Sequence, residues 1–283
     1  MMRIRILGPL SIHHGTVEMT PTAQKPRTLL ALLLLHHGQV VPVSDMMDEL
    51  WKGVPPKNAR AALQIYVFHL RKGLALGTGV PSAEVARTML RTVQNGYRLA
   101  VEPAHFDLEI HHRLRRAGGS AMAAGDLRSA AMYFREALNL WHGPVMSDVE
   151  PGTRIRAEAA ALEQSRMTML DYRIELDLKL GLHRQILSEL AVLTSQNRFH
   201  ENVHAQYMIA LYRSGYRIRA LELFHKLRRD LLDEFGLEPS AKLKEFHQSV
   251  LTLDPALDDA EVVAPPPRPA ADLPEIPALA SSF

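Results

Sequence analysis

The chain contains no cysteine among its 283 residues. Disulfides, thiolate-bound zinc and cysteine nucleophiles are therefore excluded, and such a composition fits a reducing cytosol. The apolar run "LLALLLL" stops at His36, well short of the roughly 18 residues that a membrane span needs. The start, "MMRIRILGPL", lacks the hydrophobic region and cleavage site of a signal peptide. We therefore expect a cytoplasmic protein without a membrane partner.

Motifs of catalysis and of metal binding are also missing. No Gly-x-x-x-x-Gly-Lys-Ser/Thr loop occurs, which excludes a nucleotide-triphosphate site of that type. The 14 histidines include adjacent pairs, but neighbours on a helix or strand do not converge on one metal ion, and no His-Glu-x-x-His motif is present. No set of nucleophile, base and orienting group can be assembled. The sequence therefore predicts neither an enzyme nor a protein with a metal or another cofactor.

Charge is distributed unevenly along the chain, although the net charge is only +2. Residues 1–104 hold 12 Lys and Arg against 6 Asp and Glu, residues 105–253 hold 20 against 19, and residues 254–283 hold 1 against 6. The basic N-terminal third favours an anionic partner. The acidic, proline-rich end predicts a disordered tail that is either inert or binds a partner.

The first 104 residues predict a short sheet, three helices and a closing hairpin. "RIRILGPLSI" and "TVEMT" read as strands, and "AQKPRTLLALLLLHHG" reads as a helix with Pro26 at its first position and Gly38 just past its end. Ser44 suits the N-cap of a second helix. "GTGVPS" reads as a flexible loop, and Asn95-Gly96 is a strong signal for a two-residue hairpin turn. This order describes a winged helix, whose third helix enters the major groove of DNA.

The third helix, "NARAALQIYVFHLRKGL", has apolar residues on two sides. At about 100° per residue, one side forms a core face composed of Ala59, Leu63, Val67, Leu70 and Leu74. The opposite side mixes polar and apolar residues, namely Ala61, Gln64, Ile65, Phe68, His69 and Lys72. Glutamine can bond adenine, and Ile or Phe can contact a thymine methyl group. Arg60 and Arg71 flank this side and could reach phosphates. Alternatively, Ile65 and Phe68 pack on a neighbouring element or a second subunit.

The hairpin has two faces of different character. Pairing across Asn95-Gly96 predicts one core face, composed of Leu90, Thr92, Tyr97, Leu99 and Val101. Arg91, Val93 and Arg98 share the other face. The two arginines could contact phosphates or the minor groove, or they could belong to a solvated face.

Residues after about Phe106 predict helices almost throughout. The turn glycines Gly181 and Gly215 are 34 residues apart, the period of tetratricopeptide repeats, whereas Gly125 precedes Gly181 by 56. Stacked helix pairs leave a concave surface for partners. We therefore predict a mainly α fold with a small β component: a winged helix-turn-helix DNA-binding domain over 1–104, an all-α tetratricopeptide-like repeat domain over 105–253, and the tail over 254–283.

Several stretches in this order carry a family resemblance: "DELWKGVPPKNARAALQIYVFHLRKGL", "NGYRL", "AMAAGDLRSAAMYFREALNLWHGP", "LYRSGYRIRALELFHKLRRDLLDEFGLEPS" and "FHQSVL". Together the chain resembles the Streptomyces antibiotic regulatory protein (SARP) family, an OmpR-type winged helix followed by a bacterial transcriptional activation domain. The resemblance implies a cytoplasmic, nucleoid-associated activator of secondary-metabolite genes. It would bind direct repeats in double-stranded promoter DNA near the −35 element as a side-by-side homodimer and recruit the RNA polymerase holoenzyme.

The resemblance also implies roles for particular residues. The groove-reading helix would act through Arg60, Gln64, Ile65, Phe68, His69, Arg71 and Lys72. Lys25 and Arg27 would contact phosphates. Contact with RNA polymerase, including its sigma factor, would involve Trp51, Lys52, Val54, Pro55, Pro56 and Lys57.

The wing tip departs from the family pattern. Val93, Gln94 and Asn95 stand where the family often has a basic residue and prolines, so the expected wing contacts shift to Arg91 and Arg98. Phe68 and His69 also stand where basic residues are frequent, which favours a T-rich site.

Three other hypotheses stay open at the level of sequence. The chain could be a helical-repeat scaffold whose winged helix binds protein rather than DNA. It could be an enzyme of an unrecognised kind, although no site supports this. The concave surface expected of the repeats could also sense a ligand or a partner.

Overall fold

The structure is a computed structural model that describes residues 1–254 and Leu257. The predicted tail therefore lies, apart from Asp254 and Leu257, outside the described residues. Within them the chain forms two compact units. The N-terminal unit comprises residues 1–116 and 136–166, and the helical unit comprises residues 117–135 and everything described from 167 onward. Among these residues no helix is both long and apolar enough to cross a membrane.

The chain begins with the predicted small sheet, whose strands β1 (Met2–Arg5), β2 (Ser11–His14) and β3 (Val17–Glu18) are antiparallel in the order β1-β2-β3. Ile4 lies opposite Ile12, and both are buried. Because side chains alternate across a strand, this pair fixes the inward face of the sheet.

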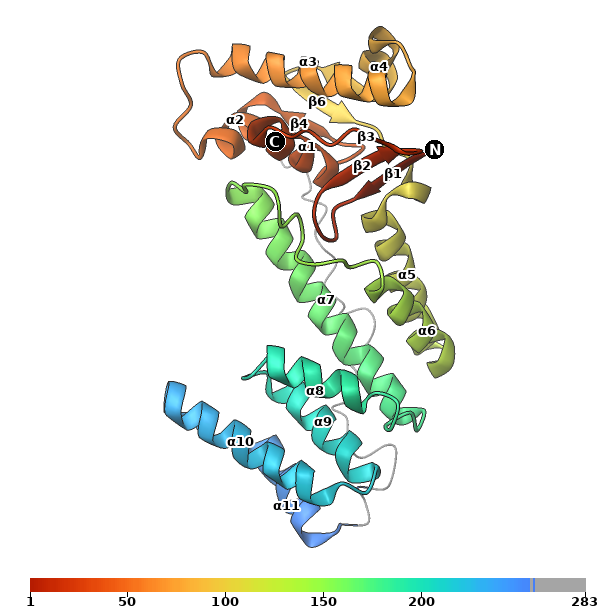
Figure 1. Cartoon of the computed structure of the whole chain (residues 1–283), viewed down its shortest axis with the longest axis vertical. Coiled ribbons are helices and arrows are strands. Elements are labelled where there is room, and N and C mark those ends of the chain that lie inside the picture. The colour runs from red at the N-terminus through yellow and green to blue at the C-terminus, as the bar shows by residue number, and fades with distance from the viewer. Residues whose placement is uncertain (255–256, 258–283) are drawn as a thin grey trace. The chain divides into compact units, whose positions relative to one another are not determined.

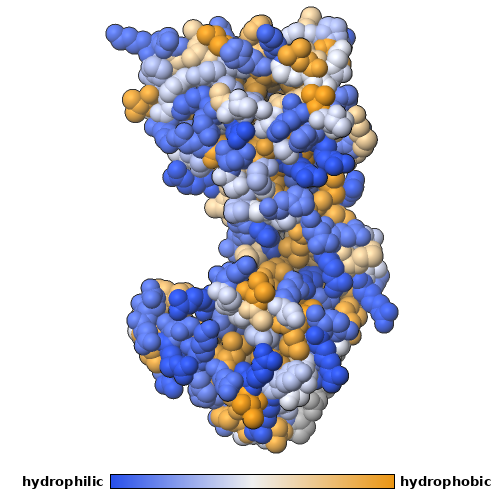
Figure 2. Space-filling model, viewed as in Figure 1, coloured by the Kyte–Doolittle hydropathy of each residue, from blue (hydrophilic) through white to orange (hydrophobic). Residues whose placement is uncertain are grey.

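Four helices follow in the N-terminal unit (Figure 1): α1 (Gln24–Leu35), α2 (Val43–Trp51), α3 (Ala59–Thr78) and α4 (Ser82–Thr88). The stretch from Thr28 to Leu34 in α1 is buried on all sides, which explains its continuous apolar sequence. On the face drawn in Figure 2, the surface over these elements is largely hydrophilic with separate hydrophobic spots.

Three sequence predictions about these helices were wrong. Pro26 is the third residue of α1, which begins at Gln24, and not its first. Ser44 does not cap α2: the helix begins at Val43, the Ser44 hydroxyl donates to Asp45, and the Val43 N–H donates to the carbonyl of Asn95 at 2.8 Å. The wing thus satisfies a donor at the start of α2. "GTGVPS" is not wholly a loop, since α3 runs to Thr78 and α4 begins at Ser82.

The wing is a three-stranded antiparallel sheet of β4 (Val40–Pro42), β5 (Leu90–Val93) and β6 (Gly96–Leu99) in the order β4-β6-β5. Val93 pairs with Gly96, so the two-residue turn is Gln94-Asn95 rather than the predicted Asn95-Gly96. Asn95 takes the positive φ of 54°, which asparagine tolerates. Gly96 serves another purpose: a Cβ there would lie 2.3 Å from the carbonyl oxygen of Val41 on β4. Sequence reasoning missed β4 and hence this reason for the glycine.

The remainder is helical, as predicted. A 3-10 turn (Pro103–His105) leads into the helices α5 (Asp107–Ala123), α6 (Leu127–Leu138), α7 (Thr153–Lys179), α8 (Leu187–Gln196), α9 (Glu201–Arg213), α10 (Arg217–Phe235) and α11 (Ala241–Thr252). Gly125, Gly181 and Gly215 have φ of +77°, +75° and +88° at the turns between helices. The length of α7, 27 residues, accounts for the irregular spacing of these glycines.

The hydrophobic core of the N-terminal unit draws on more than the first 104 residues. Trp141, Val145, Met146, Val149 and Ile155 belong to the same buried cluster as the residues of the winged helix. The compact units therefore do not divide at 104/105. The domain boundary that the sequence predicts there stays a prediction.

Candidate nucleic-acid interface

Helix α3 presents one buried and one exposed face. Leu63, Val67, Leu70 and Leu74 are no more than 5% exposed and pack into the core of the N-terminal unit. On the other side Ile65 is 53% exposed and Phe68 is 58% exposed. Neither side chain is covered by another part of the described chain, so the alternative in which they pack on a neighbouring element of this molecule is not what the structure shows.

The polar residues predicted for this face lie beside them. Arg60, Gln64, His69 and Lys72 are all exposed. The rings of Phe68 and His69 are 5.9 Å apart between centroids. Two apolar side chains are thus surrounded by two hydrogen-bonding groups and two cations, a composition that can contact base edges and phosphates in one groove.

Arg71 lies between α3 and the wing. Its Nε and Nη2 donate to the carbonyl of Leu90 at 3.0 and 2.8 Å, and Nη2 donates to the hydroxyl of Thr92 at 2.8 Å. The guanidinium also lies over the Tyr97 ring at 5.8 Å. Partial burial lowers the pKa of Arg71. Its donors point at β5, so the geometry makes it a residue that positions the wing.

The wing brings two further arginines together. Arg91 and Arg98 are directly opposite each other on β5 and β6, and both are exposed. Like charges in directly opposed positions destabilise an antiparallel pair. An anion placed over both guanidinium groups would remove that repulsion.

The two basic residues expected at the start of α1 point into the molecule. The Lys25 ammonium donates to the carbonyl of Leu50. Arg27 donates from Nε to the carbonyl of Pro21 at 2.8 Å and pairs with the Asp148 carboxylate at 2.9 Å. Both cations hold the N-terminal unit together in this geometry, which leaves fewer donors for a phosphate.

The loop between α2 and α3 is exposed, as its expected role requires. Val54 is 81% exposed, and Pro55, Pro56 and Lys57 are exposed as well. Its base is fixed, because Trp51 stacks on Tyr66 and Lys52 pairs with Glu150 at 2.8 Å.

Sequence reasoning missed the carboxylates that join distant segments of the N-terminal unit. Glu49 is buried and accepts backbone N–H bonds from Gly152 at 2.6 Å, Arg154 at 2.9 Å and Ile155 at 3.3 Å, at the start of α7. Asp107 accepts from Ile6 and Leu7, and burial raises its pKa to about 6. Nothing in the local sequence marks these side chains, since their partners lie about 100 positions away.

The arrangement has known counterparts. A family model described as "Bacterial transcriptional activator domain" matches residues 106–251, and one described as "Transcriptional regulatory protein, C terminal" matches residues 16–99. The regulatory protein DnrI of Streptomyces peucetius is 45% identical over 91% of this chain and 94% of its own length. The transcriptional regulator RedD of Streptomyces coelicolor is 34% identical over 90% of this chain and 72% of its own.

Longer relatives match this chain over only part of their own length. The regulatory protein AfsR of Streptomyces coelicolor is 34% identical over the whole of this chain, which spans only 27% of AfsR. Among solved structures, Mycobacterium tuberculosis EmbR in complex with a low-affinity phosphopeptide has a TM-score of 0.81 at 28% identity, covering 92% of this chain and 66% of that one. The predicted mainly α fold, a winged helix followed by an all-α repeat region, is thereby confirmed.

Proposed function

Because the chain belongs to the Streptomyces antibiotic regulatory protein family of transcriptional regulators, we propose that it activates secondary-metabolite genes from the promoter itself. In this proposal α3 and the wing bind double-stranded promoter DNA, and the loop from Trp51 to Lys57 contacts RNA polymerase. The observation that carries the proposal is the exposed face of α3, where Ile65 and Phe68 are surrounded by Gln64, His69 and Lys72.

The chemistry of that face fits the major groove. Gln64 can form two hydrogen bonds with adenine, and Phe68 and Ile65 can contact the methyl group of thymine. A water-exposed phenylalanine is unfavourable in the free protein, and burial against a base would recover this cost. We therefore propose that the protein prefers sites that contain T at the positions facing Phe68.

The wing supplies the contacts that do not depend on sequence. Arg91 and Arg98 are the wing residues that we assign to phosphates or to the minor groove. Arg60 and Lys72 would contact phosphates beside α3, while Arg71 positions the wing through Leu90 and Thr92. Each phosphate contact releases counterions and steepens the salt dependence of binding.

Polymerase recruitment would use the exposed loop and a paired arrangement on DNA. Two copies bound side by side on direct repeats near the −35 element would present two such loops on one side of the duplex. All residues from Lys52 to Asn58 are exposed, so Val54 to Lys57 can meet a partner without unfolding the base at Trp51.

Footprinting of the promoter DNA over a salt series, with and without RNA polymerase holoenzyme, tests this function. We expect protection of direct repeats about one helical turn apart, extended when polymerase is present. Phe68→Ala should weaken binding mainly at T-containing sites, and Leu76→Ala, which changes another exposed apolar residue of α3, is the matched control.

The alternative is a scaffold whose winged helix binds protein. A folded chain that leaves no footprint at low salt would favour this alternative, with Ile65 and Phe68 then serving a protein partner or a second subunit. Equal losses on every DNA for both Phe68→Ala and Arg91→Ala would undo the assignment of base and phosphate contacts.

A further inference from the structure

The helical unit contains a cavity of about 550 Å³ between α7, α9 and α11. This volume lies within the range of about 300 to 1,000 Å³ that is typical of binding sites. Leu178, Ile209, Leu243 and Phe246 provide its apolar wall. The charged lining residues are three cations, Lys179, Arg213 and Lys242, and three carboxylates, Glu175, Glu201 and Glu245.

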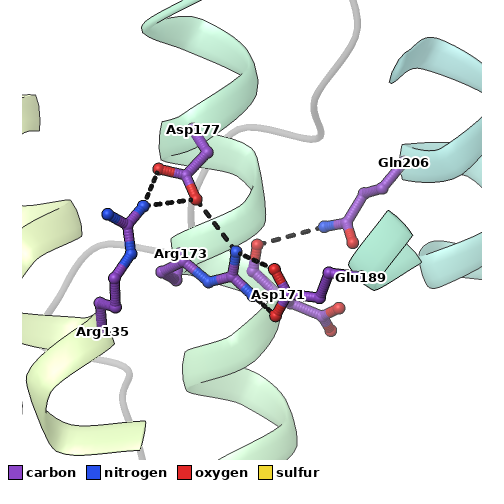
Figure 3. Close-up of polar contacts among 6 residues, drawn as sticks. All are labelled: Arg135, Asp171, Arg173, Asp177, Glu189 and Gln206. Carbon is purple, nitrogen blue, oxygen red and sulfur yellow. Dashed lines mark hydrogen bonds and ion pairs between the residues drawn. The ribbon is translucent and has the colours of Figure 1, made fainter. Parts of the chain in front are cut away.

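One buried polar group of the wall has an unused hydrogen-bond acceptor. Gln206 is only 6% exposed, and its Nε2 donates to the carbonyl of Asp171 at 3.1 Å (Figure 3), which fixes the orientation of the amide. Among the described residues its Oε1 has no hydrogen-bond partner. A buried acceptor without a donor is unfavourable in a folded protein.

The end of the described chain turns back into this cavity. After α11, Leu253 adopts the left-handed conformation with φ of 56°, and the N–H of Asp254 donates to the carbonyl of Ser249 at 3.1 Å. The N–H of Leu257 donates in turn to the carbonyl of Asp254 at 3.0 Å. Leu257 lines the cavity and is 4% exposed, whereas Leu253 is 55% exposed.

Arg213 contacts the backbone of this leucine. Its Nε donates to the carbonyl of Leu257 at 3.2 Å, while its Nη1 donates to the carbonyl of Leu178 on α7 at 3.4 Å. A buried leucine side chain combined with an arginine bond to its carbonyl is the chemistry of peptide recognition: the apolar side chain supplies burial, and the backbone bond fixes its register.

We propose that this cavity is a binding site for a short chain segment that carries a leucine, and that Leu257 of the chain itself occupies it as the anchor. Charge does not decide the assignment, because the lining holds three carboxylates beside its three cations and Lys179 pairs with Glu175 at 2.9 Å. The buried leucine side chain and its carbonyl therefore carry the recognition. A competing leucine-bearing segment would therefore have to displace Leu257 from the cavity.

Peptide binding to the full-length chain tests the proposal. The probe is a fluorescein-labelled synthetic peptide with the sequence of residues 253–264, "LDPALDDAEVVA". Leu257→Asp in the protein should release the resident anchor and increase peptide affinity at least tenfold over the unsubstituted chain. Leu253→Asp, at an exposed position of the same turn, is the matched control and should leave the affinity unchanged. Arg213→Ala added to Leu257→Asp should abolish the gain.

A second measurement tests the proposal even if Leu257→Asp impairs folding. Because the chain has no cysteine, Leu257→Cys and Leu253→Cys each introduce one thiol whose labelling rate reports its burial. We expect slow labelling at position 257, fast labelling at 253, and acceleration at 257 when excess peptide is added.

Equal labelling rates at both positions, or equal peptide affinity for all variants, would overturn the proposal. The labelling rate of the Leu257→Cys variant should not depend on protein concentration. If the thiol were labelled faster on dilution, the occupant of the cavity would belong to a second copy of the chain, and this would also overturn the proposal.

Discussion

At the scale of single residues, burial controls the protonation of His111 in the N-terminal unit. Burial lowers its pKa to about 4. The Trp141 indole N–H lies 3.3 Å from the His111 Nδ1, and since an indole can only donate, Nδ1 must be the acceptor of a neutral ring. The contact of the same atom with the carbonyl of Ala137 at 3.4 Å is therefore not a hydrogen bond in that state.

The N-terminal unit should lose stability as the pH falls from about 6.5 toward 4. Between these pH values His111 takes up a proton in the unfolded chain but stays neutral in the folded chain. The free energy of unfolding therefore falls by about 2 kcal/mol between pH 7 and pH 5. His112, whose pKa is also lowered by burial to about 4, acts in the same direction. Asp107 opposes them, because its raised pKa favours the folded state as the pH falls below 6.

Urea denaturation at pH 7 and pH 5 measures this loss. His111→Gln, which can still accept from Trp141, should reduce it by about 2 kcal/mol, whereas His69→Gln at an exposed position should not change it. A pH dependence of His111→Gln parallel to that of the unsubstituted chain would contradict the prediction.

Arg71 and Arg91 should respond differently to salt. Arg71→Ala removes the bonds to Leu90 and Thr92, so DNA affinity should fall while the slope of log K against log salt stays the same. Arg91→Ala should reduce that slope by about 1, as the loss of one phosphate contact predicts. Fluorescence anisotropy with a promoter duplex at four or more salt concentrations distinguishes them. A reduced slope for Arg71→Ala would return this residue to the set of phosphate contacts.

At the scale of secondary-structure elements, a buried ion-pair network joins three helices of the helical unit. Figure 3 shows the Asp177 carboxylate of α7 between Arg135 of α6, at 2.8 Å, and Arg173 of α7, at 3.0 Å. Arg173 continues to Glu189 of α8, with Nη1 donating at 2.8 Å. Asp177 is completely buried and Arg173 nearly so, so each charge depends on the other.

Removing one buried charge should cost far more than removing the exposed partner. Asp177→Ala leaves Arg173 buried with only Glu189 and should lower the unfolding free energy by about 3 to 5 kcal/mol. Arg135→Ala, whose side chain is 53% exposed, should cost less than about 1 kcal/mol. Thermal and urea unfolding of the two variants provides the comparison. A similar loss of unfolding free energy in both variants would show that the buried pair of Asp177 and Arg173 does not stabilise the network.

At the scale of the whole molecule, the winged helix depends on residues that follow the domain boundary predicted at 104/105. The Glu49 carboxylate caps the start of α7, and Asp148 accepts from the N–H of Leu10 at 2.7 Å. Trp141 and Ile155 share the core with the winged helix. A DNA-binding domain cut at residue 104 would lose all of these contacts.

The fragment 1–104 should therefore be less stable than the intact chain. Glu49 would keep a buried charge without its N–H donors, and apolar core residues would meet water. We expect a lower melting temperature by circular dichroism and stronger binding of a hydrophobic dye than for the fragment 1–166. Within the intact chain, Glu49→Ala should destabilise, and Glu18→Ala at an exposed position of β3 should not. Equal melting temperatures for the two fragments would show that the winged helix is self-sufficient.

Periodicity and turn chemistry predicted most of the elements from the sequence alone, although β4 and α4 were missed. The two faces of α3, the arginine face of the wing and the glycine turns of the helical region all follow from local spacing, because a helix repeats every 3.6 residues and a strand every 2. The family resemblance followed from the order of these stretches, and the comparisons confirm it.

Tertiary structure alone decided where polar side chains find their partners. Helix spacing offered Arg71 to DNA, and the family resemblance offered Lys25 and Arg27. In the folded chain Leu90, Leu50 and Asp148 accept from them. The same holds for Gly96, which is required by the approach of β4 rather than by the turn. A hydrogen-bond donor is satisfied by whichever acceptor the fold brings near it. The number of residues between two groups in the sequence does not tell how far apart they lie in the folded chain. The sequence therefore determined which faces exist, and only the fold decided which of their residues remain available to a partner.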